Sequence, residues 1–199
     1  MKILVTGFNP FNNQKINPSL ELLNALNDNY KNNKIIKLNL NVEYKKDGEL
    51  LINKIKEVNP DVVLLLGEAG GRKNVSLEYM AINMDSATIP DNKGELILHQ
   101  EIIKNAPLAY KSTINIDKVI KDLNGEKFNI SYHAGTYICN DIYYRSLNYI
   151  YENNLNIKCG FVHFPFLKEQ TVDKYKGYYS LTLDEMLDVF YKLIDSITE

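Results

Sequence analysis

Short continuous apolar runs alternate along this chain with stretches whose apolar residues recur at helical spacing. Residues 2–6 and 62–66 are runs of the kind that form strands buried on both faces of a sheet. The following stretches place apolar residues three or four positions apart, at Leu22, Leu23 and Leu26 and then at Leu51, Ile55 and Val58. Strands and helices are therefore predicted in turn, which is typical of a parallel sheet covered by helices.

Cap and turn residues define the other predicted elements. Asn17-Pro18-Ser19 begins the first helix, because asparagine is a favoured N-cap and proline suits the first helical turn. Residues 85–111, interrupted by proline and glycine, are predicted to be a long irregular excursion. Further strands or extended segments are predicted at 34–41, 75–84, 128–132 and 159–164, and further helices at 137–151 and from Thr182, with Glu185 as its capping-box partner.

These elements predict an α/β protein, a three-layer α/β/α sandwich with a twisted, mostly parallel sheet. The chain has 199 residues, of which 45% are hydrophobic, which is enough for one substantial core. We therefore expect a single domain over residues 1–199.

Charge and hydrophobicity exclude several classes of function. The 23 basic and 25 acidic residues give a net charge of −2 without a long run of either sign, so neither a nucleic-acid nor a membrane partner is expected. The longest aliphatic run, residues 62–66, is too short to span a bilayer. The N-terminal apolar stretch is interrupted by Gly7 and Pro10 and has no cleavage-site pattern, which predicts a cytoplasmic protein.

The two cysteines, Cys139 and Cys159, are too few for a disulfide framework and lack the paired spacing of a zinc site, and no metal or cofactor is indicated. Cys139 lies near a predicted helix start, where free backbone N–H groups favour an anion and lower the pKa of a thiol. A nucleophilic thiolate and a small buried hydrophobic side chain both fit that position. Cys159 enters a strand and is expected to be structural.

A cysteine nucleophile needs a base to accept its proton, and the base needs an acid or amide to fix its tautomer. His163, late in an apolar strand, is either that base or a hydrogen-bonded core residue. Glu78 lies between hydrophobic neighbours in the extended segment 75–84 and is either the acid or a surface glutamate.

In open α/β sheets, ligands bind beyond the carboxyl ends of the strands, so the loops there are candidate binding segments. Residues 67–72 follow a strand but lack the lysine of a phosphate-binding loop and the spacing of a dinucleotide motif. Their glycines either let backbone amides approach a substrate or make a tight turn. Phe8 and Phe11 either wall a ligand pocket or fill the core, and Asn17 is first of all a helix cap.

Six short motifs follow one another from the N-terminus to about residue 170. They are Thr6-Gly7-Phe8-Asn9-Pro10-Phe11 with Asn17-Pro18-Ser19, Gly67-Glu68-Ala69-Gly70-Gly71-Arg72, Glu78 with Ala81-Ile82-Asn83, Ile89-Pro90-Asp91-Asn92, Ala134-Gly135-Thr136-Tyr137-Ile138-Cys139-Asn140, and Gly160-Phe161-Val162-His163-Phe164-Pro165 with Glu169-Gln170. In order and spacing they resemble pyroglutamyl-peptidase I, a family of cysteine peptidases.

The resemblance implies an enzyme that removes N-terminal pyroglutamyl residues from peptides. It implies Cys139 as nucleophile, His163 as base and Glu78 as orienting acid, with no metal or cofactor. It also implies an α/β/α fold and a homo-oligomer, either a dimer or a tetramer.

The same resemblance implies a pocket for the lactam ring of pyroglutamate. Phe8 and Phe11 would wall this pocket, and Asn17 and Gly70 are the other expected substrate-binding residues. Peptides with an N-terminal pyroglutamate are therefore the expected partners.

Four positions depart from the family pattern. Asn12-Asn13 stand where two glycines are usual, Glu68 replaces glutamine or leucine, and Thr88 replaces an arginine. Two other hypotheses stay open, the first because of these changes and the second because of the predicted fold alone. One is a catalytically weakened or silent relative that binds capped peptides, and the other is a phosphorylase-like enzyme that uses residues 67–72 for phosphate.

Overall fold

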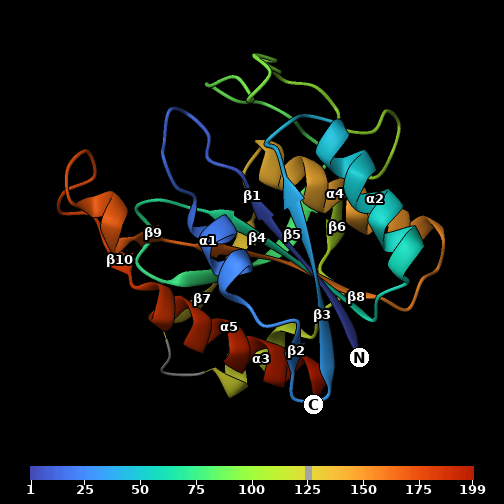
Figure 1. Ribbon diagram of the computed structural model, residues 1–199. Helices are drawn as coiled ribbons and strands as arrows, with labels where there is room; N and C mark the ends of the chain where they lie inside the picture. The colour runs from blue at the N-terminus through green and yellow to red at the C-terminus, as the bar shows by residue number, and fades with distance from the viewer. Residues whose placement is uncertain (124–126) are drawn as a thin grey trace.

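A central sheet organises the chain, and helices cover both of its faces (Figure 1). The computed structural model describes residues 1–123 and 127–199. In spatial order the strands are β2 (Asn29–Tyr30), β3 (Asn33–Leu40), β1 (Lys2–Phe8), β4 (Val62–Glu68), β8 (Lys158–Phe164), β5 (Val75–Ile82) and β6 (Ala109–Lys111), with β7 (Phe128–His133) paired to β5.

The sheet is mixed and mostly parallel, as predicted. β3, β1, β4 and β8 run parallel to one another, whereas β2 is antiparallel to β3, and β5 is antiparallel to β8 and parallel to β7. Two registers matter for the site, because His163 lies beside Gly67 of β4 and beside Ser76 of β5. Residues from β4, β5 and β8 are thereby brought to one place.

Two hydrophobic cores, one on each face of the sheet, make the predicted three layers. Ile3 and Val5 of β1 point into one core and Leu4 into the other, because successive side chains of a strand alternate between faces. The first core is covered by α1 (Pro18–Ala25), α3 (Ile116–Asp122) and α5 (Leu183–Thr198), and the second by α2 (Lys46–Val58) and α4 (Ile138–Glu152).

Side-chain caps set the helix ends as the sequence predicted. Asn17 accepts a hydrogen bond from the backbone N–H of Ser19, and Pro18 occupies the first turn of α1. Thr182 and Glu185 form a reciprocal capping box at the start of α5. Each cap satisfies backbone N–H groups that have no partner within the helix.

Short elements depart from the prediction. β6 lies at the end of the stretch expected to be irregular, and α3, which Asn115 caps, was not predicted. β6 has three residues and forms because β5 pairs with it, with Met80 beside Lys111. Such short segments carry too little periodicity to be recognised in the sequence.

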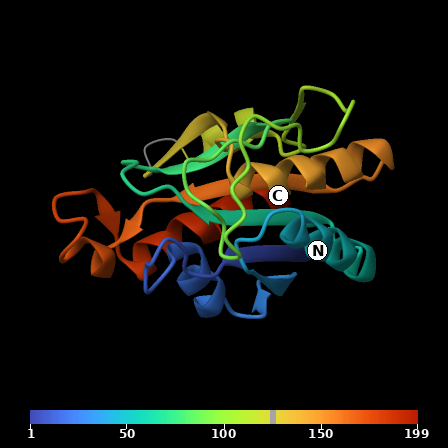
Figure 2. The ribbon, with the colours of Figure 1, turned by 90° about the horizontal axis from the view of Figure 1, so that it is seen from above.

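Residues 166–180 project from one end of the molecule, as the orange-red segment of Figures 1 and 2 shows. Two short parallel strands, β9 (Phe166–Leu167) and β10 (Ser180–Leu181), form the base of this projection. The ring of Phe166 stacks on Tyr175 with centroids 4.2 Å apart and meets the Tyr178 ring edge-on at 5.9 Å. The projection thus carries a small aromatic cluster of its own.

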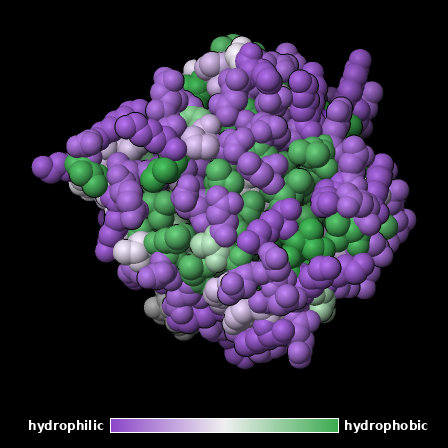
Figure 3. Space-filling model, viewed as in Figure 1, coloured by the Kyte–Doolittle hydropathy of each residue, from purple (hydrophilic) through white to green (hydrophobic). Residues whose placement is uncertain are grey.

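Hydrophilic side chains dominate the face shown in Figure 3, with smaller hydrophobic patches between them. Within residues 1–123 and 127–199, every helix falls short of the length and hydrophobicity needed to cross a membrane.

Candidate active site

Glu78 and His163 meet across neighbouring antiparallel strands. Ser76 of β5 lies opposite His163 of β8, and Glu78, two residues further on, points to the same face of the sheet. Oε1 of Glu78 lies 2.6 Å from Nδ1 of His163. Both side chains are buried, at 0% and 4% exposure. The structure therefore brings together the predicted acid and base.

The surroundings of this pair favour a charged carboxylate beside a neutral imidazole. Burial raises the pKa of Glu78, but the hydrogen bond and charge of His163, the Ser131 hydroxyl and the charge of Arg72 outweigh it and leave that pKa lowered. Burial also lowers the pKa of His163, and Arg72 acts in the same direction, while Glu78 opposes them without reversing the shift. His163 is therefore available as a base at neutral pH.

Cys139 lies in the first turn of α4, beside the strand position of His163. A Cβ built on Gly67 would come 3.0 Å from the Cys139 Sγ and 2.8 Å from the Phe161 ring. Gly67 is the register partner of His163, so the thiol lies on the face of the sheet to which the imidazole points. Glycine at position 67 leaves the space that the sulfur occupies.

The structure corrects the expectation that the Cys139 thiol has a lowered pKa. Burial, and then the charges of Glu78 and Glu68, raise the pKa of Cys139 to about 12, and Arg72 offsets this only in part. Burial and two carboxylates thus raise this pKa more than Arg72 and a backbone hydrogen bond lower it. The resting thiol is neutral, so its proton must leave as the sulfur attacks.

Alkylation of Cys139 by iodoacetamide is expected to be at least tenfold slower at pH 8 than that of a free thiol, whose pKa is about 8.5. A raised pKa means that the reactive thiolate forms only at higher pH, so the rate should still be rising above pH 10. Mass spectrometry of Cys159→Ser would follow Cys139 alone. A midpoint at or below pH 8.5 would contradict a neutral resting thiol.

A pocket opens beside the thiol, with about 310 Å³ of empty space when the solvent at its mouth is included. Its lining residues are Phe8, Phe11, Asn17, Val42, Glu68, Tyr137, Ile138 and Cys139. The predicted walls and Asn17 therefore border the same space as the nucleophile candidate. Gly70 does not line it, because Gly70 packs against the ring of Phe166, which leaves no room for a Cβ there.

The loop that carries Phe8 and Phe11 is held by buried hydrogen bonds. Oδ1 of Asn17 accepts from the Ser19 hydroxyl at 2.8 Å, and Nδ2 of Asn17 donates to the Asn9 carbonyl at 3.2 Å. The backbone N–H of Phe8 donates to the same Ser19 hydroxyl at 3.0 Å. Asn17 thus serves both as the cap of α1 and as a pocket residue.

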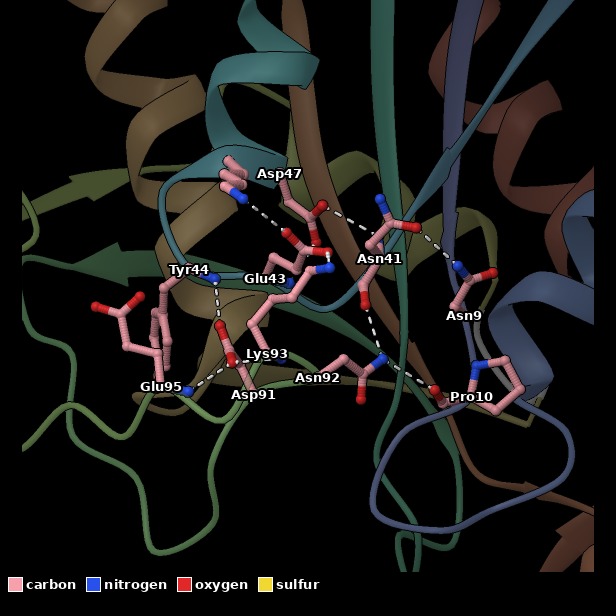
Figure 4. A network of polar contacts seen from close by, with 11 residues as sticks. Asn9, Pro10, Asn41, Glu43, Tyr44, Asp47, Asp91, Asn92, Lys93 and Glu95 are labelled. Carbon is pink, nitrogen blue, oxygen red and sulfur yellow. Dashed lines mark hydrogen bonds and ion pairs between the residues drawn. The ribbon is translucent and has the colours of Figure 1, made fainter.

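The segment at Asp91-Asn92 ties this loop to the turn between β3 and α2 (Figure 4). The side-chain amide of Asn92 donates to the Pro10 carbonyl at 3.1 Å and to the Asn41 carbonyl at 2.7 Å. Its backbone N–H donates to the carbonyl of Val42, which holds a φ of 64° that is rare for a β-branched residue. Asn92 therefore fixes two walls of the pocket relative to each other.

Glu68, one of the departures from the family pattern, accepts a hydrogen bond at each of its carboxylate oxygens. Its Oε1 accepts from Gln14 at 2.9 Å and its Oε2 accepts from Gln170 at 2.7 Å. Burial raises the pKa of Glu68, although both amide donors oppose the shift. A carboxyl group with a raised pKa therefore borders the pocket.

Thr88, another departure, is exposed and does not line the pocket. Its segment nevertheless runs beside the start of α4, since the backbone N–H of Ser86 donates to the Thr136 carbonyl at 2.8 Å. The Tyr137 hydroxyl likewise donates to the Pro90 carbonyl at 3.0 Å. A longer side chain at position 88 would therefore start in a segment that contacts Thr136 and Tyr137, just before α4.

Arg72 is the functional candidate that sequence reasoning missed. Its Nη1 lies 2.7 Å from Oε1 of Glu78, the same oxygen that contacts His163. The only signal in the sequence was its place at the end of the glycine-rich run 67–72.

In the part of the chain that the structure describes, no group of three or more histidine, cysteine or acidic side chains could hold a metal ion.

Comparison with known proteins points to one family. A family model described as pyroglutamyl peptidase matches residues 1–199. The chain is 44% identical to pyrrolidone-carboxylate peptidase 1 of Caldanaerobacter subterraneus subsp. tengcongensis, over 100% of this chain and 98% of that protein.

Solved structures agree with the family model. Pyroglutamyl peptidase I of Bacillus amyloliquefaciens superposes with a TM-score of 0.93 at 32% identity, covering 98% of this chain and 94% of the other. A mutant pyrrolidone carboxyl peptidase of the hyperthermophile Pyrococcus furiosus superposes with a TM-score of 0.94 at 35% identity, covering 100% and 98%.

Proposed function

This chain belongs to the pyroglutamyl peptidase family, and we propose that it removes N-terminal pyroglutamyl residues with Cys139, His163 and Glu78 as its catalytic triad. The observation that carries the proposal is the 2.6 Å contact between His163 and Glu78, placed beside a thiol that lines a pocket. The matching family model spans residues 1–199, which supports one peptidase domain.

The proposed reaction begins with a proton transfer. The carboxylate of Glu78 can only accept, so Nδ1 of His163 donates to it and Nε2 carries no proton. Nε2 takes the proton of the Cys139 thiol while the sulfur bonds to the pyroglutamyl carbonyl carbon. Collapse of the resulting oxyanion breaks the C–N bond, and the imidazolium returns the proton to the leaving amine. Water then hydrolyses the thioester and releases pyroglutamate.

The oxyanion needs hydrogen-bond donors near the start of α4. Backbone amides of residues 135–139 are the nearest candidates in the sequence, and the positive end of the helix dipole adds to their effect. Phe8 and Phe11 accept the flat lactam ring, and Asn17 and Glu68 supply polar atoms beside it. We retain Gly70 as a proposed binding position through its backbone alone, because it does not border the pocket.

Release of aminomethylcoumarin from pyroglutamyl-aminomethylcoumarin tests the proposal. We expect turnover without added metal or cofactor, and progressive loss after prolonged treatment with iodoacetamide. Tight binding of the peptide without turnover would favour the silent binder and would contradict the proposal. Turnover that depends on phosphate would favour the phosphorylase-like alternative.

Thr88→Arg is expected to raise kcat by roughly 10²-fold with little change in KM. An arginine there would start close to the beginning of α4 and bring a charged donor toward the developing oxyanion. A contact made mainly in the transition state acts on the rate rather than on substrate binding. Steady-state kinetics on the coumarin substrate would measure both constants.

The control for this substitution is Thr88→Gln, which adds length without charge and should leave kcat unchanged. Glu68→Gln in the Thr88→Arg background tests whether the Glu68 carboxylate draws the new guanidinium away. A fast natural enzyme that Thr88→Arg leaves unchanged would show that backbone amides alone hold the oxyanion.

We also propose a cytoplasmic location and a homo-oligomer, either a dimer or a tetramer. A catalytic thiol stays reduced in the cytosol, and both cysteines of this chain are free. The oligomer follows from the family resemblance, and sedimentation velocity would test it.

A further inference from the structure

The glycines of residues 67–72 build a tight turn that ends at Arg72. The backbone N–H of Arg72 donates to the Ala69 carbonyl at 3.2 Å, which closes a four-residue turn. Gly71, the third residue, has a φ of +89°, a conformation that type II turns require and that glycine adopts without strain. The glycines therefore make the tight turn that was one of the two roles proposed for them from the sequence.

Aromatic side chains from the projecting segment support this turn. The ring of Phe166 lies against Gly70, and a Cβ on Gly71 would come 3.3 Å from the ring of Tyr178. The Phe166 and Tyr178 rings also contact each other. The turn is thus held between its own hydrogen bond and this aromatic cluster, so Arg72 leaves it in a defined direction.

The Arg72 side chain reaches from this turn to the buried carboxylate of Glu78. Nη1 of Arg72 and Nδ1 of His163 both contact Oε1 of Glu78, at 2.7 and 2.6 Å. Arg72 is 33% exposed, whereas Glu78 is fully buried. The guanidinium adds a charged partner to the neutral groups that contact this carboxylate, namely His163 and Ser131, and restricts its orientation further.

We propose that Arg72 is a positioning residue of the triad, which holds the Glu78 carboxylate in the orientation that fixes the His163 ring. This inference rests on the proposed function for its effect on catalysis, but the contact it describes exists independently of any substrate. Arg72 is not among the residues that line the pocket. Its loss should therefore act on kcat and leave KM nearly unchanged.

The charge of Arg72 has a second consequence for the same histidine. A cation near the pair opposes protonation of His163, so the guanidinium keeps the imidazole in its basic form. The other groups that face His163 are Glu78, which favours protonation, and the Cys139 thiol, which is neutral at rest. Removal of Arg72 should therefore raise the pKa of His163 and move the acid limb of kcat/KM to higher pH.

Arg72→Gln is expected to lower kcat roughly 10- to 100-fold, because a small misplacement of a catalytic group costs that much. Arg72→Lys keeps the charge without the planar fork, so it should lose less kcat and retain the acid limb of the natural enzyme. The matched control is Lys73→Gln, which removes an exposed cation from the neighbouring position. It should change neither kcat nor the acid limb of kcat/KM.

Direct titration of the histidines provides a readout that does not depend on turnover. The chain has only three histidines, so their ring signals in NMR spectra are few, and His163→Asn identifies the signal of His163. In Arg72→Gln the midpoint of that signal should move to higher pH. Circular dichroism would confirm that each variant is folded.

The outcomes separate the two proposals. An unchanged kcat and an unchanged His163 titration in Arg72→Gln would overturn the inference, as would equal losses in Lys73→Gln. A fall in kcat with an unmoved titration would also overturn it, because Arg72 would then support only the turn. If the natural enzyme releases no coumarin while the titration still moves, the proposed function fails and the placement of Arg72 stands.

Discussion

Cys139→Ser is expected to reduce release of coumarin by at least about 10⁴-fold while the protein stays folded. A hydroxyl is a far weaker nucleophile than sulfur, and its proton is harder to remove than that of a thiol, in a site arranged around the larger sulfur atom. Serine is also close to cysteine in size, so the packing against Gly67 and Phe161 should survive. Initial rates on the coumarin substrate and circular dichroism spectra are the measurements.

Cys159→Ser is the matched control, since it makes the same chemical change on the same strand as His163. Cys159 is fully buried in the second core, away from the pocket lining. A buried hydroxyl costs stability, so the midpoint of thermal unfolding should fall while kcat stays within about threefold of the natural value. Equal losses of activity in the two variants, both folded, would argue against a unique nucleophile.

Long, strongly periodic segments made the layers of this fold predictable. The buried runs at β1 and β4 and the capped ends of α1 and α5 have local causes, namely apolar content and cap residues, that the sequence displays. β6 was not predictable in the same way, because pairing with β5 rather than its own three residues makes it a strand. The antiparallel direction of β5 relative to β8 is likewise set by tertiary packing.

The candidate site likewise contains residues that the sequence indicates locally and residues that depend on tertiary contacts. Cys139 at a helix start and His163 late in a strand could be selected by residue type and place, whereas Glu78 became specific only through the family resemblance. Neither approach identified Arg72, because its contact with Glu78 depends on how a surface turn folds back over a buried strand. The raised pKa of Cys139 also escaped prediction, since it depends on burial and on carboxylates from two other strands.

Prolyl-aminomethylcoumarin should be cleaved on the order of 10⁴-fold less efficiently than the pyroglutamyl compound, in kcat/KM. Proline offers Phe8 and Phe11 a ring of similar size, but it lacks the lactam carbonyl. The hydrogen-bond donors beside Asn17 that would pair with this carbonyl then stay unpaired in a mostly apolar pocket. Leaving a buried polar group unpaired is costly. Comparable cleavage of the two compounds would mean that the pocket does not hold the lactam.

Glu68 decides how far this discrimination extends. It is the only acidic residue of the pocket lining, and the ring nitrogen of an N-terminal proline carries a positive charge at neutral pH. An ionised Glu68 would therefore attract the wrong substrate, although its two oxygens are already engaged by Gln14 and Gln170. Glu68→Gln removes that attraction and should increase the preference for pyroglutamyl over prolyl substrate roughly tenfold, mainly through weaker prolyl cleavage. If the substitution narrows the preference instead, Glu68 contributes to holding the lactam, and its carboxylate rather than its size is what the substrate requires.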